Sequence, residues 1–391
     1  MIRPTILPRS HLLMIKRDRE RGTKRTQYVC LDRNEQVTPL PKRLRQEILR
    51  GLPADAFNAY PEPSPLYERL SRTLEIAEDE LLVTAGSDSA IRRVFETFVD
   101  PGDTVVFADP TFPMYEVYSQ MYQAKPVVIP FETSRDLPID RVFDALLEQP
   151  RILALVNPAQ PTGTTIAAPL MRRLAAAAEA AGTVFLVDEA YFPFFPDTAV
   201  SWFAGFSNVI VTRTFSKAGG IAGLRLGYLV TNRRFTGFLE KTRGSHEVNA
   251  VAIAVGSYLL DHPEIEGARL HEIETGRAVL NTAAQKLSLE TPDCEGNFQL
   301  LSFPGAEDTT PWIEALRGRG FLVKGPFSAP CVRNCIRVTL DGPETMRSFT
   351  RALASVVRDL PLDPATNDAV LPDHFEPAMS WSRESPRTSN A

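Results

Sequence analysis

Short apolar runs alternate with helix-like stretches through the first half of the chain. Apolar positions spaced three and four apart predict helices at 90–98, 114–122, 139–147 and 170–181. Continuous apolar runs of strand length lie between them, at 81–84, 104–107, 126–130, 152–156 and 184–187. A run that is apolar on both faces is typical of a strand covered by helices on both sides. The alternation therefore predicts an α/β fold, with a mostly parallel sheet and helices on both of its faces.

The pattern changes outside this region. Long helices are expected at 247–260 and 265–287, and after them short strands alternate with helices, which predicts a small α+β domain. The first 27 residues are basic and weakly periodic, so we interpret them as an arm that either wraps a partner subunit or stays mobile. The predicted organisation is an N-terminal arm at 1–27, the N-terminal part of the small domain at 28–55, a large domain at 56–275, the C-terminal α+β part of the small domain at 276–360, and a loose tail at 361–391.

Composition and charge indicate which kinds of partner the protein is expected to bind. A chain of 391 residues can form one large domain and a smaller one, and its net charge of -5, with both signs interspersed, favours neither nucleic acid nor a membrane surface. No apolar stretch approaches the ~20 residues of a membrane span, and the N-terminus lacks a signal-peptide core, so we expect a cytoplasmic protein. The four cysteines lack further ligands at metal-binding spacing, so reduced thiols and no metal are expected.

One stretch, residues 212–228 (TRTFSKAGGIAGLRLGY), carries the chemistry that stands out most. Lys217 follows an apolar strand-like run and lies beside glycines and apolar residues, which remove water from its amine. Loss of hydration lowers the pKa of a lysine and makes it a nucleophile suited to a Schiff base. The hydroxyls of Thr214 and Ser216 and the guanidinium of Arg225 could hold a phosphate. The alternative is an exposed lysine and arginine that flank a loop.

Other polar residues follow the predicted strands at the edge where parallel sheets bind ligands. Gly86, Ser87 and Asp88 stand between a strand and a helix, where free amides bind anions, although such residues are also common as plain helix caps. Asp188 ends the apolar run FLVD. A buried carboxylate needs a cationic or hydrogen-bonding partner, and either a protonated ring nitrogen or a neighbouring turn would serve.

These motifs, in this order, resemble the fold-type I pyridoxal-phosphate aminotransferases, in the branch similar to histidinol-phosphate aminotransferase, over about residues 30–355. The resemblance implies pyridoxal 5'-phosphate as cofactor, held through a Schiff base on Lys217. Asp188 would pair with the pyridine nitrogen and keep it protonated, so that the ring acts as an electron sink. Tyr191 would hydrogen-bond the ring hydroxyl, and Phe112 would stack on the ring. The matches to the phosphate cradle are Gly86, Ser87, Asp88, Thr214, Ser216 and Arg225.

The resemblance also implies how subunits and substrate are bound. Tyr60 matches a tyrosine that reaches the phosphate of the neighbouring subunit, which implies a homodimer with shared active sites. Arg337, in the segment CIRVTL, matches the arginine that binds the substrate α-carboxylate through a bidentate fork.

Three positions depart from the family pattern. Gln160 stands where the family usually has an asparagine that binds the ring hydroxyl, so the amide is displaced by about 1 Å. The family segment LDxNENP continues here as Gln36 and Val37 after LDRNE. Ser348 occupies the place of a second arginine found in histidinol-phosphate enzymes, with Arg347 one residue earlier. Histidinol phosphate is therefore not carried over as the substrate.

The sequence thus predicts a pyridoxal-phosphate-dependent aminotransferase that moves an amino group between an amino acid, or an amino-acid-like amine, and a keto acid through Lys217. One alternative keeps the cofactor but acts as a decarboxylase, cyclase, lyase or oxidase, because the bond at Cα that lies perpendicular to the ring decides the reaction. Another alternative is a cofactor-binding regulator. It would need an appended DNA-binding domain, for which the arm before residue 28 is too short.

Overall fold

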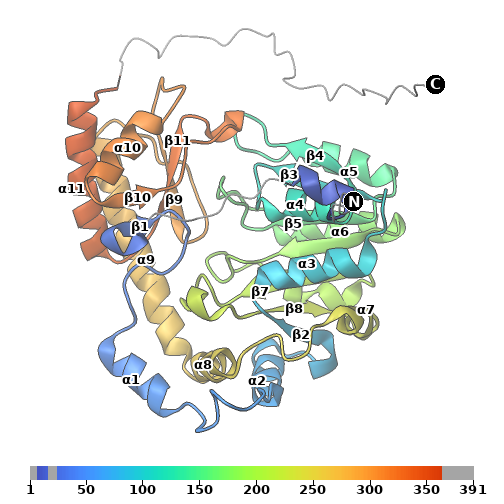
Figure 1. The fold of residues 1–391 in the computed structure, drawn as a ribbon. Coiled ribbons are helices and arrows are strands. Elements are labelled where there is room, and N and C mark those ends of the chain that lie inside the picture. Colours follow the sequence, from blue (N-terminus) through green and yellow to red (C-terminus); the bar gives the residue numbers. More distant parts are fainter. Residues whose placement is uncertain (1–6, 16–23, 363–391) are drawn as a thin grey trace, which may run out of the picture.

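The apolar runs between residues 81 and 231 pair into one seven-stranded sheet, in the order β2-β8-β7-β6-β5-β3-β4 (Figure 1). The structure is a computed structural model and describes residues 7–15 and 24–362. The strands are β2 (Leu81–Thr84), β3 (Thr104–Asp109), β4 (Lys125–Pro130), β5 (Ile152–Val156), β6 (Val184–Asp188), β7 (Val209–Thr214) and β8 (Gly227–Thr231). Neighbours from β4 to β7 run parallel, and β8 is antiparallel to both β2 and β7. The predicted fold class is confirmed.

Helices cover both faces of this sheet. One face packs in a core with α2 (Ser64–Leu74), α5 (Ile139–Leu147), α6 (Ala168–Ala180) and α8 (Ala250–Asp261). The other packs with α3 (Ser87–Phe98), α4 (Met114–Met121) and α7 (Arg233–Leu239). Successive side chains of a strand point to opposite faces, so both cores draw on β5, with Leu153 and Leu155 in one and Ile152 and Ala154 in the other. This two-sided burial explains why the strands read as continuous apolar runs.

Strand β8 was not predicted, because its residues follow directly on the glycine-rich stretch around Lys217. All five of its residues are buried, and it lies between β2 and β7. Its first residue, Gly227, passes so close to the turn before α3 that a Cβ there would lie 2.6 Å from the backbone nitrogen of Ser87. A glycine is required for this approach. The close contact brings the two segments with phosphate-binding motifs together.

The rest of the described chain forms a smaller unit beside the sheet (Figure 1). Strand β9 (Phe298–Ser302) pairs antiparallel with β11 (Cys335–Thr339), and β1 (Val29–Leu31) pairs parallel with β10 (Phe321–Val323). Helices α9 (Pro263–Lys286), α10 (Thr310–Gly318) and α11 (Pro343–Asp359) share one apolar core with these strands. Helix α1 (Lys42–Arg50) instead buries Ile48 in a core of the large sheet.

The predicted domain boundaries stay predictions. The tail at 363–391 and the arm residues 1–6 and 16–23 lie outside the described residues. Within the described part of the arm, a short helical turn at Ser10–Met14 lies against α4. Among the helices described in residues 7–15 and 24–362, none has the length and apolar character needed to cross a membrane.

Candidate active site

A pocket of about 190 Å³ opens at the carboxyl ends of the central strands of the sheet. It gathers most of the predicted site residues from five separate stretches of sequence. Its lining consists of Ser87, Asp88, Phe112, Val156, Gln160, Asp188, Ala190, Tyr191, Thr214, Ser216, Lys217 and Arg225. Parallel strands bring residues from distant parts of a chain to one edge, which is why these segments meet.

Lys217 projects into the pocket from the turn after β7. Its Nζ donates a hydrogen bond of 2.9 Å to the carbonyl of Arg33 and lies 5.9 Å from the centre of the Tyr191 ring. Burial lowers the pKa of the amine to about 7, and the charge of Arg337 acts in the same direction. A large fraction of this lysine is therefore neutral and nucleophilic at physiological pH, whereas an ordinary lysine is protonated.

Asp188 lies on the floor of the pocket and is almost fully buried. Its oxygens accept hydrogen bonds of 3.1 Å each from the hydroxyls of Tyr115 and Thr212 and from the amide of Ala190. Burial raises the pKa of Asp188 to about 6, and these three bonds only partly oppose the rise. All three donors are neutral, and among the described side chains none forms an ion pair with the carboxylate, although Lys217 interacts with it through its charge. A cationic ligand atom at the pocket would form one.

The residues of the predicted phosphate cradle line the same pocket, except Gly86, which directly precedes Ser87. Thr214 Oγ1 donates to Ser216 Oγ at 2.9 Å, and Arg225 Nη1 donates to the same oxygen at 3.3 Å. Helix α3 begins at Ser87, directly after Gly86, which has a φ of 84°. The cradle thus combines two hydroxyls, a guanidinium and the free amides of a helix N-terminus, a donor set that suits a phosphate dianion. The side chain of Asp88 accepts from Tyr118 at 2.8 Å, so Asp88 would contribute through its backbone.

Gly86 offers a test of this cradle. A Cβ at this position would lie 2.6 Å from Nη2 of Arg225, so Gly86→Ala should displace the guanidinium and weaken cofactor binding by about tenfold or more, since charge-assisted hydrogen bonds contribute ~1.5–3 kcal/mol each. The measurement is the dissociation constant of pyridoxal phosphate, compared with that of pyridoxal, which lacks the phosphate. The loss should fall on the phosphorylated compound alone.

Gly102→Ala is the matched control for Gly86→Ala. Gly102 also has a positive φ, of 95°, but no neighbouring atom lies within 4 Å of its would-be Cβ. A positive φ disfavours alanine at both positions, and with a ψ of 166° Gly86 lies in a region that glycine alone adopts readily, so the comparison with pyridoxal is needed to separate strain from phosphate binding. If Gly102→Ala weakened phosphate recognition equally, backbone strain rather than the cradle would explain the result.

Tyr191 and Gln160 meet at the side of the pocket. The Tyr191 hydroxyl donates to Oε1 of Gln160 at 3.0 Å, so the longer side chain of glutamine still reaches this tyrosine. Burial raises the pKa of Tyr191 above its usual value, and the charge of Arg337 and a hydrogen bond from Asn34 oppose that rise. The phenol is therefore a neutral hydrogen-bond donor over the physiological pH range. The nearby Phe112 ring lines the pocket and meets Tyr115 edge-on, with centroids 6.3 Å apart.

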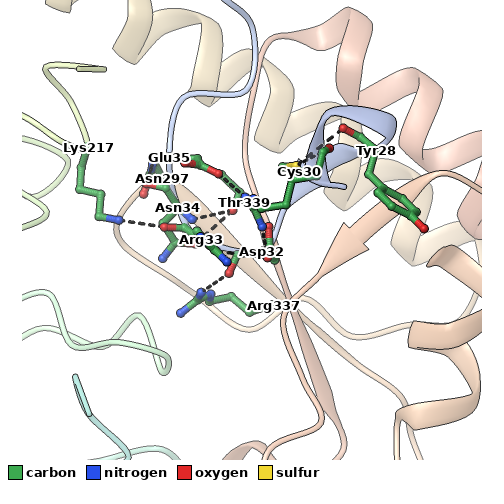
Figure 2. Close-up of polar contacts among 11 residues, drawn as sticks. Tyr28, Cys30, Asp32, Arg33, Asn34, Glu35, Lys217, Asn297, Arg337 and Thr339 are labelled. Carbon is green, nitrogen blue, oxygen red and sulfur yellow. Dashed lines mark hydrogen bonds and ion pairs between the residues drawn. The ribbon is translucent and has the colours of Figure 1, made fainter. Parts of the chain in front are cut away.

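Arg337 lies on β11, outside the pocket lining and beside the segment around Asp32 (Figure 2), and its charge acts on Lys217. Its side chain is almost fully buried, and Nη2 donates to the carbonyl of Asp32 at 2.8 Å. Its Nε is buried and has no hydrogen-bond partner among the described residues. A purely structural salt bridge would require a carboxylate, and none forms an ion pair with Arg337 within residues 7–15 and 24–362. The guanidinium is therefore placed to bind an incoming anion.

Tyr60 is not part of the pocket of its own chain. Its side chain is 81% exposed and stacks on the His246 ring, with centroids 4.2 Å apart. An exposed aromatic ring held in a fixed position is the kind of residue that a second subunit could use. Its predicted role there stays a prediction.

Several residues that shape the site were missed from the sequence. Tyr115 and Thr212 hold Asp188, and Asn34 holds Tyr191. Thr212 carried a signal, because it opens the stretch around Lys217, and Asn34 lies in the segment LDRNE. Tyr115 is one of several aromatic residues in a helix and carried no signal of its own.

Three features of the pocket fit pyridoxal phosphate. The cradle suits its phosphate, Asp188 forms no ion pair with the described side chains and could form one with a protonated ring nitrogen, and Lys217 offers an amine of lowered pKa for its aldehyde. These three groups line one pocket, as a single bound molecule would require. The fold and the pocket thus define a class of enzyme that uses this cofactor.

Comparison with known proteins agrees with this class. Residues 28–353 match the family described as aminotransferase class I and II. A protein named histidinol-phosphate aminotransferase 2 from Burkholderia pseudomallei is 33% identical over 334 residues, covering 84% of this chain and 92% of the relative. A histidinol-phosphate aminotransferase from Caldanaerobacter subterraneus is 29% identical over 331 residues, covering 84% and 92%.

Solved structures show the same fold. The structure of histidinol-phosphate aminotransferase from Sinorhizobium meliloti in complex with pyridoxal-5'-phosphate has a TM-score of 0.81 at 21% identity, covering 92% of this chain and all of that one. L-threonine-O-3-phosphate decarboxylase from Porphyromonas gingivalis has a TM-score of 0.71, also at 21% identity, covering 84% and 99%. The chain belongs to the aminotransferase class I and II family. It is a pyridoxal-phosphate-dependent aminotransferase.

Proposed function

We propose that this enzyme moves an amino group between an amino acid, or an amine that carries another anionic group, and a keto acid, with Lys217 as the residue that holds the cofactor. The observation that carries the proposal is that two groups with shifted pKa values line one pocket. Lys217 has a lowered pKa, and Asp188 has a raised pKa and forms no ion pair with the described side chains. Strongly shifted pKa values that cluster in one pocket are characteristic of functional sites.

The side chains divide the work in this proposal. Pyridoxal phosphate, when bound, supplies a ring that withdraws electrons from the substrate Cα. Asp188 would hold a proton on the ring nitrogen, and the cradle would anchor the phosphate. Lys217 Nζ is the base placed to move the proton at the substrate Cα. Tyr191 and Gln160 would bind the ring hydroxyl, and Phe112 would cover one face of the ring.

Arg337 defines the proposed substrate class. A buried guanidinium with an unpaired Nε is best matched by a carboxylate or phosphate, which accepts two parallel hydrogen bonds. The relatives named histidinol-phosphate aminotransferase make that amine a compound to test. The absence of a second arginine at Ser348 favours an α-amino acid instead.

A homodimer completes the proposal. Tyr60 is exposed and lies outside the pocket of its own chain. In the dimer, Tyr60 of each subunit would reach the phosphate cradle of the other subunit. We expect this dimer in the cytoplasm.

A substrate screen tests the reaction. The purified enzyme is incubated with amino acids and histidinol phosphate, with and without a keto-acid acceptor. Multiple turnovers that require the acceptor are expected. Release of carbon dioxide or consumption of oxygen without an acceptor would contradict transamination and would support the decarboxylase or oxidase alternative.

Arg337→Ala tests the substrate class. We expect kcat/KM for an amino acid to fall by at least about 10- to 100-fold, because a bidentate carboxylate contact contributes ~1.5–3 kcal/mol or more. The value for the corresponding amine without the carboxylate should change little. Both are measured together with cofactor content and melting temperature.

The matched control is Arg333→Ala, which removes an exposed arginine four residues earlier. It should leave both substrates unaffected. Equal losses on both substrates in Arg337→Ala, with a lower melting temperature, would show a structural role for Arg337.

A further inference from the structure

Asn34 lies in a hydrogen-bond network with Asn297 and Thr339, next to the bond between Lys217 and Arg33 (Figure 2). It follows β1 in a left-handed backbone conformation, with a φ of 54°, and its side chain is fully buried. Asn297 Nδ2 donates to the Asn34 carbonyl at 2.9 Å. Arg25 binds Asp32 and Glu35 on either side of it. The backbone of Asn34 is thus held in place independently of its side chain.

The side-chain amide of Asn34 has a defined direction. The backbone N–H of Asn34 donates to Thr339 Oγ1 at 2.9 Å, so this hydroxyl acts as an acceptor there. Its own proton is then free to be donated, and it points at Asn34 Oδ1, 3.2 Å away. A backbone N–H cannot accept a hydrogen bond, so the order cannot be reversed. Thr339 therefore turns the Nδ2 side of the amide towards the pocket.

The orientation of the Asn34 amide also fixes that of the Tyr191 hydroxyl. Asn34 Nδ2 can only donate hydrogen bonds, and it donates one to the Tyr191 oxygen at 2.8 Å. Because the tyrosine oxygen accepts on that side, its single proton must point elsewhere, and it is donated to Gln160 Oε1 on the pocket side. All four groups are buried or line the pocket, where water competes weakly for these bonds.

We propose that Asn34 is a positioning residue that, through its hydrogen bond with Thr339, holds the Tyr191 hydroxyl as a donor towards the pocket. The inference rests on the proposed function, in which Tyr191 faces the hydroxyl of the cofactor ring. An anionic ring oxygen needs donors, and a tyrosine free to rotate could present its lone pairs instead. Asn34 removes that choice before the cofactor arrives, which is preorganisation.

Other charged groups face Tyr191 and do not account for this direction. Arg337 and Asp188 act on the phenol through their charges, and Lys217 lies 5.9 Å from its ring centre. None of the three has a hydrogen bond to the Tyr191 oxygen. Arg337 and Lys217 instead donate to the backbone carbonyls of Asp32 and Arg33.

The test follows the visible absorption of the bound cofactor against pH. A lost donor to the ring oxygen raises the pKa of the proton that this oxygen shares, so the midpoint of the absorption change moves up. Tyr191→Phe removes the donor completely and therefore gives the largest shift of this midpoint, which we expect to be about one pH unit or more. Asn34→Gly tolerates the left-handed backbone and should give a shift of the same sign. Thr339→Val should do so as well, whereas Thr339→Ser keeps the hydroxyl and should match the wild type.

The double variants decide whether Asn34 acts through Tyr191. In the Tyr191→Phe background, neither Asn34→Gly nor Thr339→Val should move the midpoint further. An additive shift, or no shift in the single variants, would overturn the positioning role. If Asn34→Gly did not fold, the Thr339→Val and Thr339→Ser pair would decide the same question. A wild type without Lys217-dependent cofactor absorption would instead refute the proposed function itself.

Discussion

Lys217→Ala should abolish turnover, with kcat/KM reduced by about 10⁴-fold or more, because general acid–base transfer alone contributes ~10²–10⁴ and the covalent anchor is lost as well. Borohydride treatment of the wild type should fix the cofactor to Lys217, as shown by peptide mass. The variant should bind the cofactor reversibly and yield no reduced adduct. A reducible adduct that survives the substitution would show that another lysine is the attachment point.

Lys241→Ala is the control for a lost lysine. Lys241 is exposed, and its amine lies 5.4 Å from the Phe238 ring, away from the pocket. The variant should keep full activity and the borohydride adduct.

The pH dependence of cofactor loading gives a second readout for Lys217. Only the neutral amine attacks the aldehyde, so the loading rate of the cofactor-free enzyme should rise as the pH passes about 7 and then level off. A lysine in water would require a pH near ~10. A rate that keeps rising to pH 10 would contradict the lowered pKa of Lys217.

Asp188→Asn should lower kcat/KM by about 10²–10³-fold, or ~2.7–4 kcal/mol, which is typical for removing one preorganised electrostatic group. Asparagine removes the charge and has nearly the same shape: its Oδ1 can still accept from Thr212 and Ala190, and its Nδ2 can donate to the Tyr115 hydroxyl, which donates to Asp188 in the wild type. Asp79→Asn is the control, because Asp79 forms an exposed ion pair with Arg233 and such pairs contribute little. Equal activity in wild type and Asp188→Asn would exclude a role for the carboxylate.

Asp188→Asn should lower activity but should not lower the stability of the cofactor-free enzyme. The folded-state pKa of Asp188 is raised to about 6, above its ordinary value of 3.8. Between these values the folded state binds more protons than the unfolded state, so burial of Asp188 costs stability as the pH rises through this window. Above pH 6, Asp188→Asn should therefore have a melting temperature equal to or above that of the wild type. A large fall would point to a structural role instead.

Local patterns were enough to predict the main architecture. The runs at 81–84 and 152–156 and the helix at 139–147 have the same bounds in the structure as in the sequence pattern. The two strands are apolar on both faces and the helix has apolar residues three and four apart, and both signals depend only on neighbours along the chain. The strand ends that meet around the pocket were equally predictable, because a parallel sheet brings its carboxyl ends together.

The resemblance to a family predicted more than periodicity did, because it assigned Lys217 and Asp188 to the same cofactor. It could not show how they are perturbed. The pKa of Lys217 is lowered by burial and by the charge of Arg337, which lies 120 positions later in the sequence and belongs to another sheet.

What only the tertiary structure decided is the set of contacts between distant segments. Strand β8 enters the sheet between β2 and β7, and no local pattern reveals strand order. Asn34 and Thr339 are 305 positions apart, yet they orient Tyr191 through bonds whose direction depends on which atom faces which. Apolar periodicity indicates which face of an element will be buried, because the spacing of apolar residues within that element sets its apolar face. The direction of a hydrogen bond depends on two atoms from separate elements, and only the folded chain brings them together.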